Sequence, residues 1–184
     1  MATFCARGYR ATTLEEVGDQ VGITRGTVLH HFHSKAELLS AVVDPYLRAI
    51  ADLLLHGSVD DLTTASQRRK FLTELADLLL EHRGTVQLLA TDVATRVQLG
   101  LVDRWAAPSH KLLTLLVGSN PSDVGRVRVA AALGAIVQPV ASVQLDLETP
   151  GARCEIVDAA LAVLDRPSPA MLLATTAAST KSRY

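Results

Sequence analysis

The chain has 184 residues, enough for one domain or two small domains with a sizeable core. Hydrophobic residues make up 48% and aromatic residues only 4%, so the core must be built from alanine, leucine and valine. Alanine and leucine favour helices, and no long alternating run indicates a strand, so we expect an all-α protein. The formal net charge of −1 gives no global indication of nucleic-acid binding.

Cysteine use and hydropathy indicate the compartment. Cys5 and Cys154 lie far apart without the spacing of metal ligands, which favours a reducing interior. The longest apolar run, from Val129 to Val137, is much shorter than the ~20 residues that a membrane-spanning helix needs. The N-terminus also lacks the basic start and apolar segment of a signal peptide. We therefore expect a cytoplasmic protein that has no membrane partner and needs no cofactor.

A first short helix is predicted directly after Thr13. Thr13 and Glu16 form a capping box, and apolar residues recur at helical spacing over residues 14–21. Gly22 follows the last apolar position, as expected where a helix ends in a residue with positive φ.

Two further helices are predicted after the glycine. Thr24 can cap a short helix, whose Val28 and Phe32 would point toward the core. Ser34 and Glu37 form another capping box, which opens a longer helix. Two short helices joined by a glycine turn and followed by a longer helix are typical of a helix-turn-helix.

The middle helix carries the candidate DNA contacts. At about 100° per residue, the side opposite Val28 and Phe32 carries Gly26 and His30, flanked by Thr27 and Leu29, while Arg25 lies in the first turn. The exposed side therefore offers a guanidinium, a hydroxyl and an imidazole, which can meet base edges and phosphates. The candidate set is Thr24, Arg25, Gly26, Thr27, Leu29, His30, His31 and Lys35.

Two other interpretations of this helix remain open. A metal site is disfavoured, because His30 and His31 diverge by about 100° and no carboxylate or cysteine stands at ligand spacing near His33. An ordinary solvated helix is the other alternative. Residues 1–44 hold four lysines and arginines against five acidic residues, so any positive surface must come from placement rather than excess.

Residues 4–39 closely resemble the N-terminal domain of the TetR family of transcriptional regulators. The matches at fixed spacing are Phe4, Gly8, Tyr9, Thr12, Thr13, Val17, Gly22, Ile23, Thr24, Gly26, Thr27, Val28, His30, His31, Phe32, Ser34, Lys35, Leu38 and Leu39. The resemblance implies a helical DNA-binding domain at residues 1–44, joined to a helical domain at 45–165 that binds a small molecule and dimerises. Thr24 and Lys35 would then hold phosphates, while Arg25, Thr27 and His30 would reach bases or the adjoining backbone.

Three features depart from the pattern of that family. Leu29 stands where a tyrosine that contacts the DNA backbone is usual. Gly18 stands in place of alanine, at a cost of up to about 1 kcal/mol of helix propensity. The segment before Gly8 is shorter than the first helix of the family, so we expect either a native start upstream of Met1 or a loosely held DNA-binding half.

Past Leu39, apolar periodicity predicts helices over about residues 65–82, 85–99, 101–117, 121–145 and 150–164. Pro45 predicts a kink or break, and Pro108 a bend. The last two helices correspond to the pair through which TetR-like proteins dimerise, with an internal core pair as the alternative. The Pro-, Ser- and Thr-rich residues 166–184 predict a mostly disordered tail.

The effector is the least determined part. By analogy with the family it would be an apolar, aromatic or lipid-like small molecule, held between the helices after residue 65. The candidate ligand contacts are Phe71, Gln87, Trp105 and His110.

Catalysis is disfavoured, since the chain has no G-x-S-x-G, no phosphate-binding glycine loop and no H-E-x-x-H. We expect a transcriptional regulator instead, in the form of a ligand-released repressor that binds a palindromic operator as a dimer. The alternative is a helical small-molecule-binding or interaction protein of the same fold that has weak or lost DNA binding. The charge balance, Leu29 and the short N-terminus favour that alternative.

Overall fold

The computed structural model describes residues 2–56, 62–149 and 151–166. The described residues form an all-α fold, as the composition predicts. Its eleven helices are α1 (Ala2–Ala11), α2 (Leu14–Val21), α3 (Arg25–His31), α4 (Lys35–His56), α5 (Ala65–Glu81), α6 (Arg83–Thr91), α7 (Val93–Gln98), α8 (Leu101–Arg104), α9 (Ala106–Val117), α10 (Asp123–Ala141) and α11 (Ala152–Leu164).

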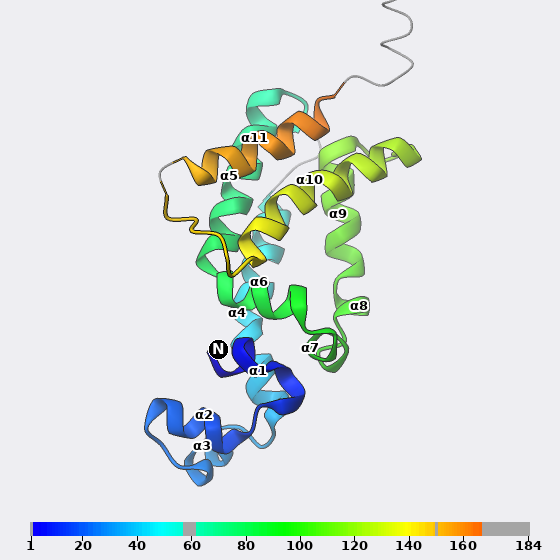
Figure 1. Cartoon of the computed structure of the whole chain (residues 1–184). Coiled ribbons are helices and arrows are strands. Elements are labelled where there is room, and N and C mark those ends of the chain that lie inside the picture. Colours follow the sequence, from blue (N-terminus) through cyan, green and yellow to red (C-terminus); the bar gives the residue numbers. More distant parts are fainter. Residues whose placement is uncertain (1, 57–61, 150, 167–184) are drawn as a thin grey trace, which may run out of the picture.

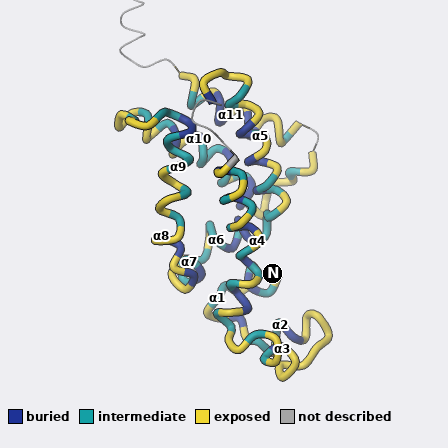
Figure 2. Tube along the Cα trace, turned by 180° about the vertical axis from the view of Figure 1, so that it is seen from behind, coloured by how far each residue is buried: buried dark blue, intermediate teal, exposed yellow. Residues whose placement is uncertain are grey.

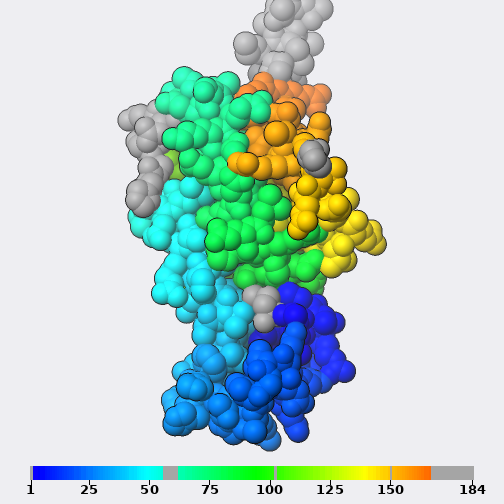
Figure 3. All heavy atoms as spheres, turned by 90° about the vertical axis from the view of Figure 1, so that its left-hand side faces the viewer, coloured from blue at the N-terminus to red at the C-terminus, as the bar shows by residue number. Residues whose placement is uncertain are grey.

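The helices are arranged along one long axis. Helices α1 to α3 form one end of the molecule, and α4 runs from them toward the opposite end, where α10 and α11 lie (Figure 1). The space-filling view shows the N-terminal segment at the end opposite α10 and α11, packed against the segments that follow it (Figure 3). Helix α3, which carries the candidate DNA contacts, therefore lies at the tip of the molecule.

Local hydrogen bonds explain why α2 and α3 begin where they do. The N–H of Glu16 donates to Thr13 Oγ1 (3.2 Å), and the N–H of Thr13 donates to Glu16 Oε2 (2.8 Å), which completes the predicted capping box. Gly22 ends α2 with φ 74°. The side chain of Thr24 then caps α3. These three predictions are confirmed.

Gly18 owes its place to the turn that follows α2. The N–H of Ile23 donates to the carbonyl of Gly18 (3.0 Å), and a Cβ added to Gly18 would lie 2.6 Å from the Ile23 carbonyl oxygen. The glycine therefore lets the turn close onto the helix. This steric role of Gly18 depends on the turn and is not visible in its helix propensity.

We predict that Gly18→Ala lowers the free energy of unfolding by about 1 kcal/mol, because overpacking costs about 1–3 kcal/mol and outweighs a propensity gain of about 1 kcal/mol. Urea unfolding followed by circular dichroism measures this change. The matched control is Gly26→Ala, where the added Cβ would come no closer than 3.6 Å to Thr24 Oγ1. Stabilisation by both substitutions would contradict the steric account.

The N-terminal helices share their core with the rest of the chain. The N-terminal cluster consists of Phe4, Val28, Leu38, Leu39, Val43, Leu88, Leu99 and Leu101. Its last three members belong to α6, to the end of α7 and to α8. One apolar cluster therefore joins the helix-turn-helix to α6, α7 and α8.

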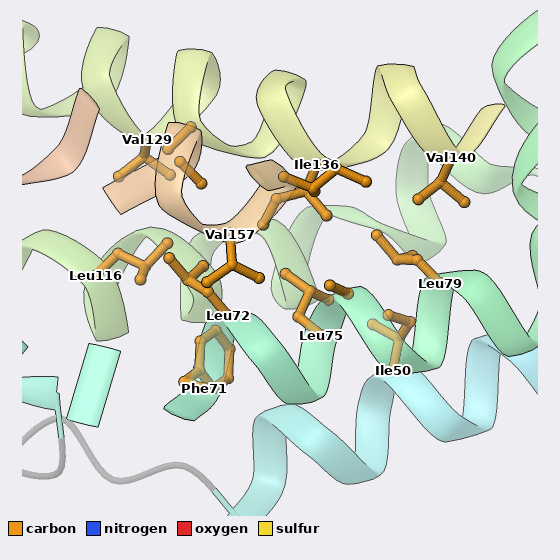
Figure 4. Close-up of a cluster of buried hydrophobic side chains, with 14 of the residues drawn as sticks. Ile50, Phe71, Leu72, Leu75, Leu79, Leu116, Val129, Ile136, Val140 and Val157 are labelled. Carbon is orange, nitrogen blue, oxygen red and sulfur yellow. The ribbon is translucent and has the colours of Figure 1, made fainter. Parts of the chain in front are cut away.

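A larger core fills the other end of the molecule. Figure 4 shows Leu72, Leu75 and Leu79 of α5 facing Val129, Ile136 and Val140 of α10, with Ile50 of α4, Leu116 of α9 and Val157 of α11 closing the sides. Leucine, valine and alanine supply most of this core, as the composition predicts. Phe71 also packs here and is 5% exposed.

The helix boundaries differ from the prediction at three points. Helix α4 continues through Pro45 instead of breaking. The segment expected as one helix over 85–99 divides at Asp92, because the Asp92 side chain caps a new helix, α7. The segment expected over 101–117 divides at Trp105, between α8 and α9, and Pro108 lies inside the first turns of α9. Residues 57–61 of the predicted polar loop and residues 167–184 of the predicted tail lie outside the described residues.

One helix in the described part of the chain, α10, is long and apolar enough by length and composition to cross a membrane. The longest uninterrupted apolar run, from Val129 to Val137, was too short to predict a membrane-spanning helix. One face of α10 buries Val129, Ala132, Ile136 and Val140 in the larger core. A core helix of a soluble protein passes the same test of length and composition.

Candidate nucleic-acid interface

Helix α3 presents the predicted DNA contacts on one solvent-facing side. Val28 is 3% exposed and anchors the helix, and Leu29 is half-buried. The exposed residues are Arg25, Gly26, Thr27, His30 and His31. Figure 2 shows that much of the chain around α2 and α3, at the tip, is exposed. The structure therefore brings together most of the residues chosen from the sequence.

The start of α3 is held by two threonines. Thr24 Oγ1 accepts a hydrogen bond from the N–H of Thr27 (3.2 Å) and lies 3.0 Å from Thr27 Oγ1. Both hydroxyls are exposed, so a phosphate oxygen can approach them without displacing core residues. This position suits the phosphate contact predicted for Thr24.

The Arg25 guanidinium is exposed and, within the described residues, has no hydrogen-bond or ion-pair partner. The rings of His30 and His31 lie edge to face, with centroids 5.4 Å apart. In the described ranges, no group of three His, Cys, Asp or Glu side chains is arranged to hold a metal ion. A free guanidinium and two exposed imidazoles on one short helix are groups that can hydrogen-bond to base edges.

Lys35 has a different environment from the one predicted. Its Nζ donates to the carbonyls of Tyr9 (2.8 Å), Thr12 (2.9 Å) and Arg10 (3.3 Å) and lies 4.5 Å from the centre of the Tyr9 ring. Since an ammonium has three N–H donors, these contacts use all of them. In this arrangement Lys35 ties the end of α1 to α4, and its predicted phosphate contact would require it to leave those carbonyls.

Asp92 is a residue that sequence reasoning missed. Its Oδ2 accepts from the N–H of Tyr9 (2.5 Å) and from Thr95 Oγ1 (3.0 Å), while Oδ1 accepts from the N–H groups of Ala94 (2.9 Å) and Thr95 (3.3 Å). Burial alone would raise the pKa of Asp92, but these hydrogen bonds hold it below its ordinary value. The capping signal was present in the sequence. The contact with Tyr9, 83 positions away, was not.

Gly8 allows this contact to form. It has φ 76° and ψ 168° within α1, and a Cβ added there would lie 3.0 Å from Asp92 Oδ2. A side chain at this position would be strained by the backbone and would crowd the carboxylate. Gly8 therefore allows Asp92, at the junction of α6 and α7, to accept a hydrogen bond from α1.

Residues 1–42, which form α1 to α3 and the start of α4, match the family model described as bacterial regulatory proteins, tetR family. Residues 1–42 therefore carry a tetR-type N-terminal domain. The family model describes regulatory proteins, which agrees with the expectation of a transcriptional regulator rather than an enzyme.

Three relatives illustrate the likeness. The HTH-type transcriptional repressor KstR2 of Mycobacterium tuberculosis is 33% identical over 99 residues, which cover 52% of this chain and 48% of KstR2. The probable HTH-type transcriptional regulator ArpR of Pseudomonas putida is 36% identical over 93 residues, or 50% of this chain and 40% of ArpR. The HTH-type transcriptional activator FasR of Mycolicibacterium smegmatis is 29% identical over 100 residues, or 52% and 44%. The chain thus spans about half the length of the relatives it matches, or less.

Beyond its TetR-type domain, the chain has an apolar cavity of about 430 Å³ that is open to solvent on one side. The lining residues come from α4 and from α6 to α10 and are Tyr46, Leu47, Val86, Leu89, Ala90, Arg96, Leu101, Trp105, Ala106, Ser109 and Val137. An adjoining cavity of about 100 Å³ shares four of these walls, among them Tyr46 and Trp105. The two rings are stacked with centroids 6.3 Å apart, and burial raises the pKa of Tyr46 to about 12.

The four predicted ligand contacts lie in different places. Trp105 lines both cavities. Phe71 packs in the larger core, Gln87 is half-buried on α6 and His110 is exposed on α9. These last three are not among the residues that line either cavity. Helical periodicity identifies an inward face, but it does not distinguish a packed core from a cavity wall.

Proposed function

We propose that the chain is a DNA-binding transcriptional regulator that acts as a homodimer on a palindromic operator and releases it when a small apolar ligand binds. The observation that carries this proposal is the exposed face of α3, where Arg25 is free of partners among the described residues and Val28 anchors the helix. The tetR-family match and the KstR2 relative, which is named a repressor, support it. A regulator of this kind acts in the cytoplasm.

Two copies of α3 would enter successive major grooves. Helix-turn-helix dimers bind half-sites about 34–36 Å apart, or a multiple of that distance, and place the N-terminal residues of the recognition helix against base edges. Arg25 lies in the first turn of α3, where this geometry brings it close to the bases. Thr24 and Thr27 would then contact the adjoining backbone, with His30 and His31 one turn further along.

The surface of α10 and α11 supports the homodimer. Helix α10 has one face in the core, yet Val124 and Val127 on its other side are 51% and 67% exposed. Small exposed residues continue this surface on both helices, namely Ala130, Ala131, Ala159 and Ala162. A second copy packed on these helices would bury the valines and complete a four-helix interface. Burial of α10 against a second copy would also explain its apolar composition without a membrane.

We predict that Arg25→Ala weakens binding to the operator about 10-fold or more, because a bidentate contact to a base is worth about 1–3 kcal/mol. Binding to unrelated DNA should fall much less. Fluorescence anisotropy with both duplexes at one fixed salt concentration measures the two affinities. Arg25→Lys is the matched variant, since it keeps the charge but loses the planar fork. Equal losses on both duplexes would exclude base reading by Arg25.

The small number of free basic side chains in residues 1–44 favours a second candidate function. This candidate is a ligand-binding protein of the same fold that has weak or lost DNA binding. Arg7 forms an ion pair with Glu16, and Lys35 is bound to carbonyls. Arg10 and Arg25 are then the remaining lysine or arginine side chains of residues 1–44 without a partner among the described residues. Binding of this chain to ligand but to no DNA at low salt would select this candidate.

A further inference from the structure

Arg96 is the one charged side chain among the residues that line the larger cavity. The other walls are apolar or aromatic, apart from the hydroxyls of Ser109 and Tyr46. A guanidinium cannot lose its proton in a protein, so the cavity holds a permanent positive charge beside a mainly apolar space.

The guanidinium is fixed in place by backbone. Its Nη1 donates to the carbonyls of Leu89 (2.6 Å) and Ala90 (3.2 Å), near the end of α6. No carboxylate in the described residues lies within ion-pair distance of it, although other arginines in the same ranges, such as Arg68 and Arg153, have such partners. Arg96 is half-buried, and its Nε and Nη2 have no recorded partner in that part of the chain.

A partly desolvated charge without a counter-ion favours an anion at that point. Removing a charge from water is costly unless it is paired, and a guanidinium pairs best with a planar carboxylate. Stacked Tyr46 and Trp105, together with Leu47 and Val137, offer an apolar surface to the rest of the ligand. The cavity volume of about 430 Å³ lies within the range of about 300–1,000 Å³ that small-molecule sites have.

We propose that the cavity binds an amphiphilic monocarboxylate, with its anionic end on Arg96 and its apolar body along Tyr46 and Trp105. This names the ligand class of the effector site and rests on the proposed function only for the role of that ligand as an effector. The adjoining cavity, which shares Tyr46 and Trp105, extends the space for an elongated body.

The single tryptophan of the chain provides the measurement, since Trp105 lies in the cavity wall. The full chain is titrated without DNA at neutral pH with decanoate, 1-decanol and decylamine, which share one apolar body, and Trp105 fluorescence is followed. We expect decanoate to bind at least about tenfold tighter than 1-decanol, as a charge-assisted hydrogen bond allows, and decylamine to bind most weakly.

Arg96→Gln should bring the affinities for decanoate and 1-decanol to within about twofold of each other and leave that for 1-decanol unchanged. If Arg96→Gln lowers the melting temperature through loss of the bonds to α6, Arg96→Lys provides a second comparison. Arg96→Lys keeps a positive charge and should retain part of the preference for decanoate over 1-decanol. Arg104→Gln is the matched control, because Arg104 pairs with Asp44 and lies outside the lining of this cavity. It should keep the full preference.

Equal affinity of the unaltered chain for decanoate and 1-decanol would overturn the proposal, as would a preference that survives Arg96→Gln or a fluorescence signal that responds to none of the three probes. DNA binding is measured separately by gel shift. A chain that binds decanoate through Arg96 but binds no DNA would refute the proposed function and leave this inference standing.

Discussion

Replacing Phe4 with alanine is expected to lower the free energy of unfolding of the N-terminal half by about 3–5 kcal/mol, the usual cost of removing a buried aromatic ring. Phe4 is 1% exposed, lies 6.4 Å from the Tyr9 ring in a stacked arrangement and joins Val28 and Leu39 in the N-terminal cluster. The short first helix has few other buried side chains, so α1 would detach and uncover the cluster. DNA binding would be lost together with α1.

Hydrogen exchange measures where that stability is lost. In the Phe4→Ala variant, amides of residues 14–32 should exchange much faster, while those of residues 124–137 in the larger core should keep their protection. Val21→Ala is the control, since Val21 is 64% exposed. Unchanged protection over residues 14–32 would mean that α1 does not shield the N-terminal cluster from solvent. In the unaltered chain, the same comparison tests the predicted looseness, which requires weaker protection over 14–32 than over 124–137.

Asp92→Ala is expected to cost about 2–4 kcal/mol, because it removes a helix cap worth about 0.5–2 kcal/mol and a charge-assisted hydrogen bond worth about 1.5–3 kcal/mol. The second of these is the bond from the Tyr9 N–H, which joins the α6–α7 junction to α1. Asp92→Asn keeps a capping oxygen and should cost less. Urea unfolding at neutral pH gives both values, and Asp146→Ala, at an exposed loop position, is the control. A loss of unfolding free energy below about 1 kcal/mol for Asp92→Ala would contradict the role of Asp92 as both a helix cap and the acceptor from the Tyr9 N–H.

The same carboxylate predicts a pH dependence. Its hydrogen bonds hold the pKa of Asp92 below the ordinary value of 3.8 in the folded chain. The stabilisation is therefore fully present above that value and is lost as the pH falls through the folded pKa. The difference in unfolding free energy between the unaltered chain and Asp92→Asn should stay constant above about pH 5 and shrink toward about pH 3. A difference that grows on acidification would contradict this sign.

Local signals in the sequence were sufficient for the helix-turn-helix. Thr13 with Glu16, Gly22 and Thr24 act through hydrogen bonds within a few residues, so their roles could be predicted from spacing. The exposed face of α3 followed from helical periodicity alone. The fold class followed from a composition rich in alanine and leucine.

Long-range contacts were beyond such signals. Lys35 meets carbonyls 23 to 26 positions away, and Asp92 meets an N–H 83 positions away, so their partners depend on how the helices pack. The clash that a Cβ at Gly18 would make with the Ile23 carbonyl depends on the path of the turn after α2. The cavity around Trp105 and Arg96 arises where α4 and α6 to α10 leave space, which periodicity does not encode.

Selection of genomic DNA fragments by the purified full chain, followed by footprinting, tests the central claim most directly. The account predicts a discrete palindromic site, with half-sites one helical turn or a multiple apart, that lies near the chain's own gene and is no longer enriched by Arg25→Ala. Enrichment of no site above the genomic background, with equal recovery by the unaltered chain and Arg25→Ala, would contradict it.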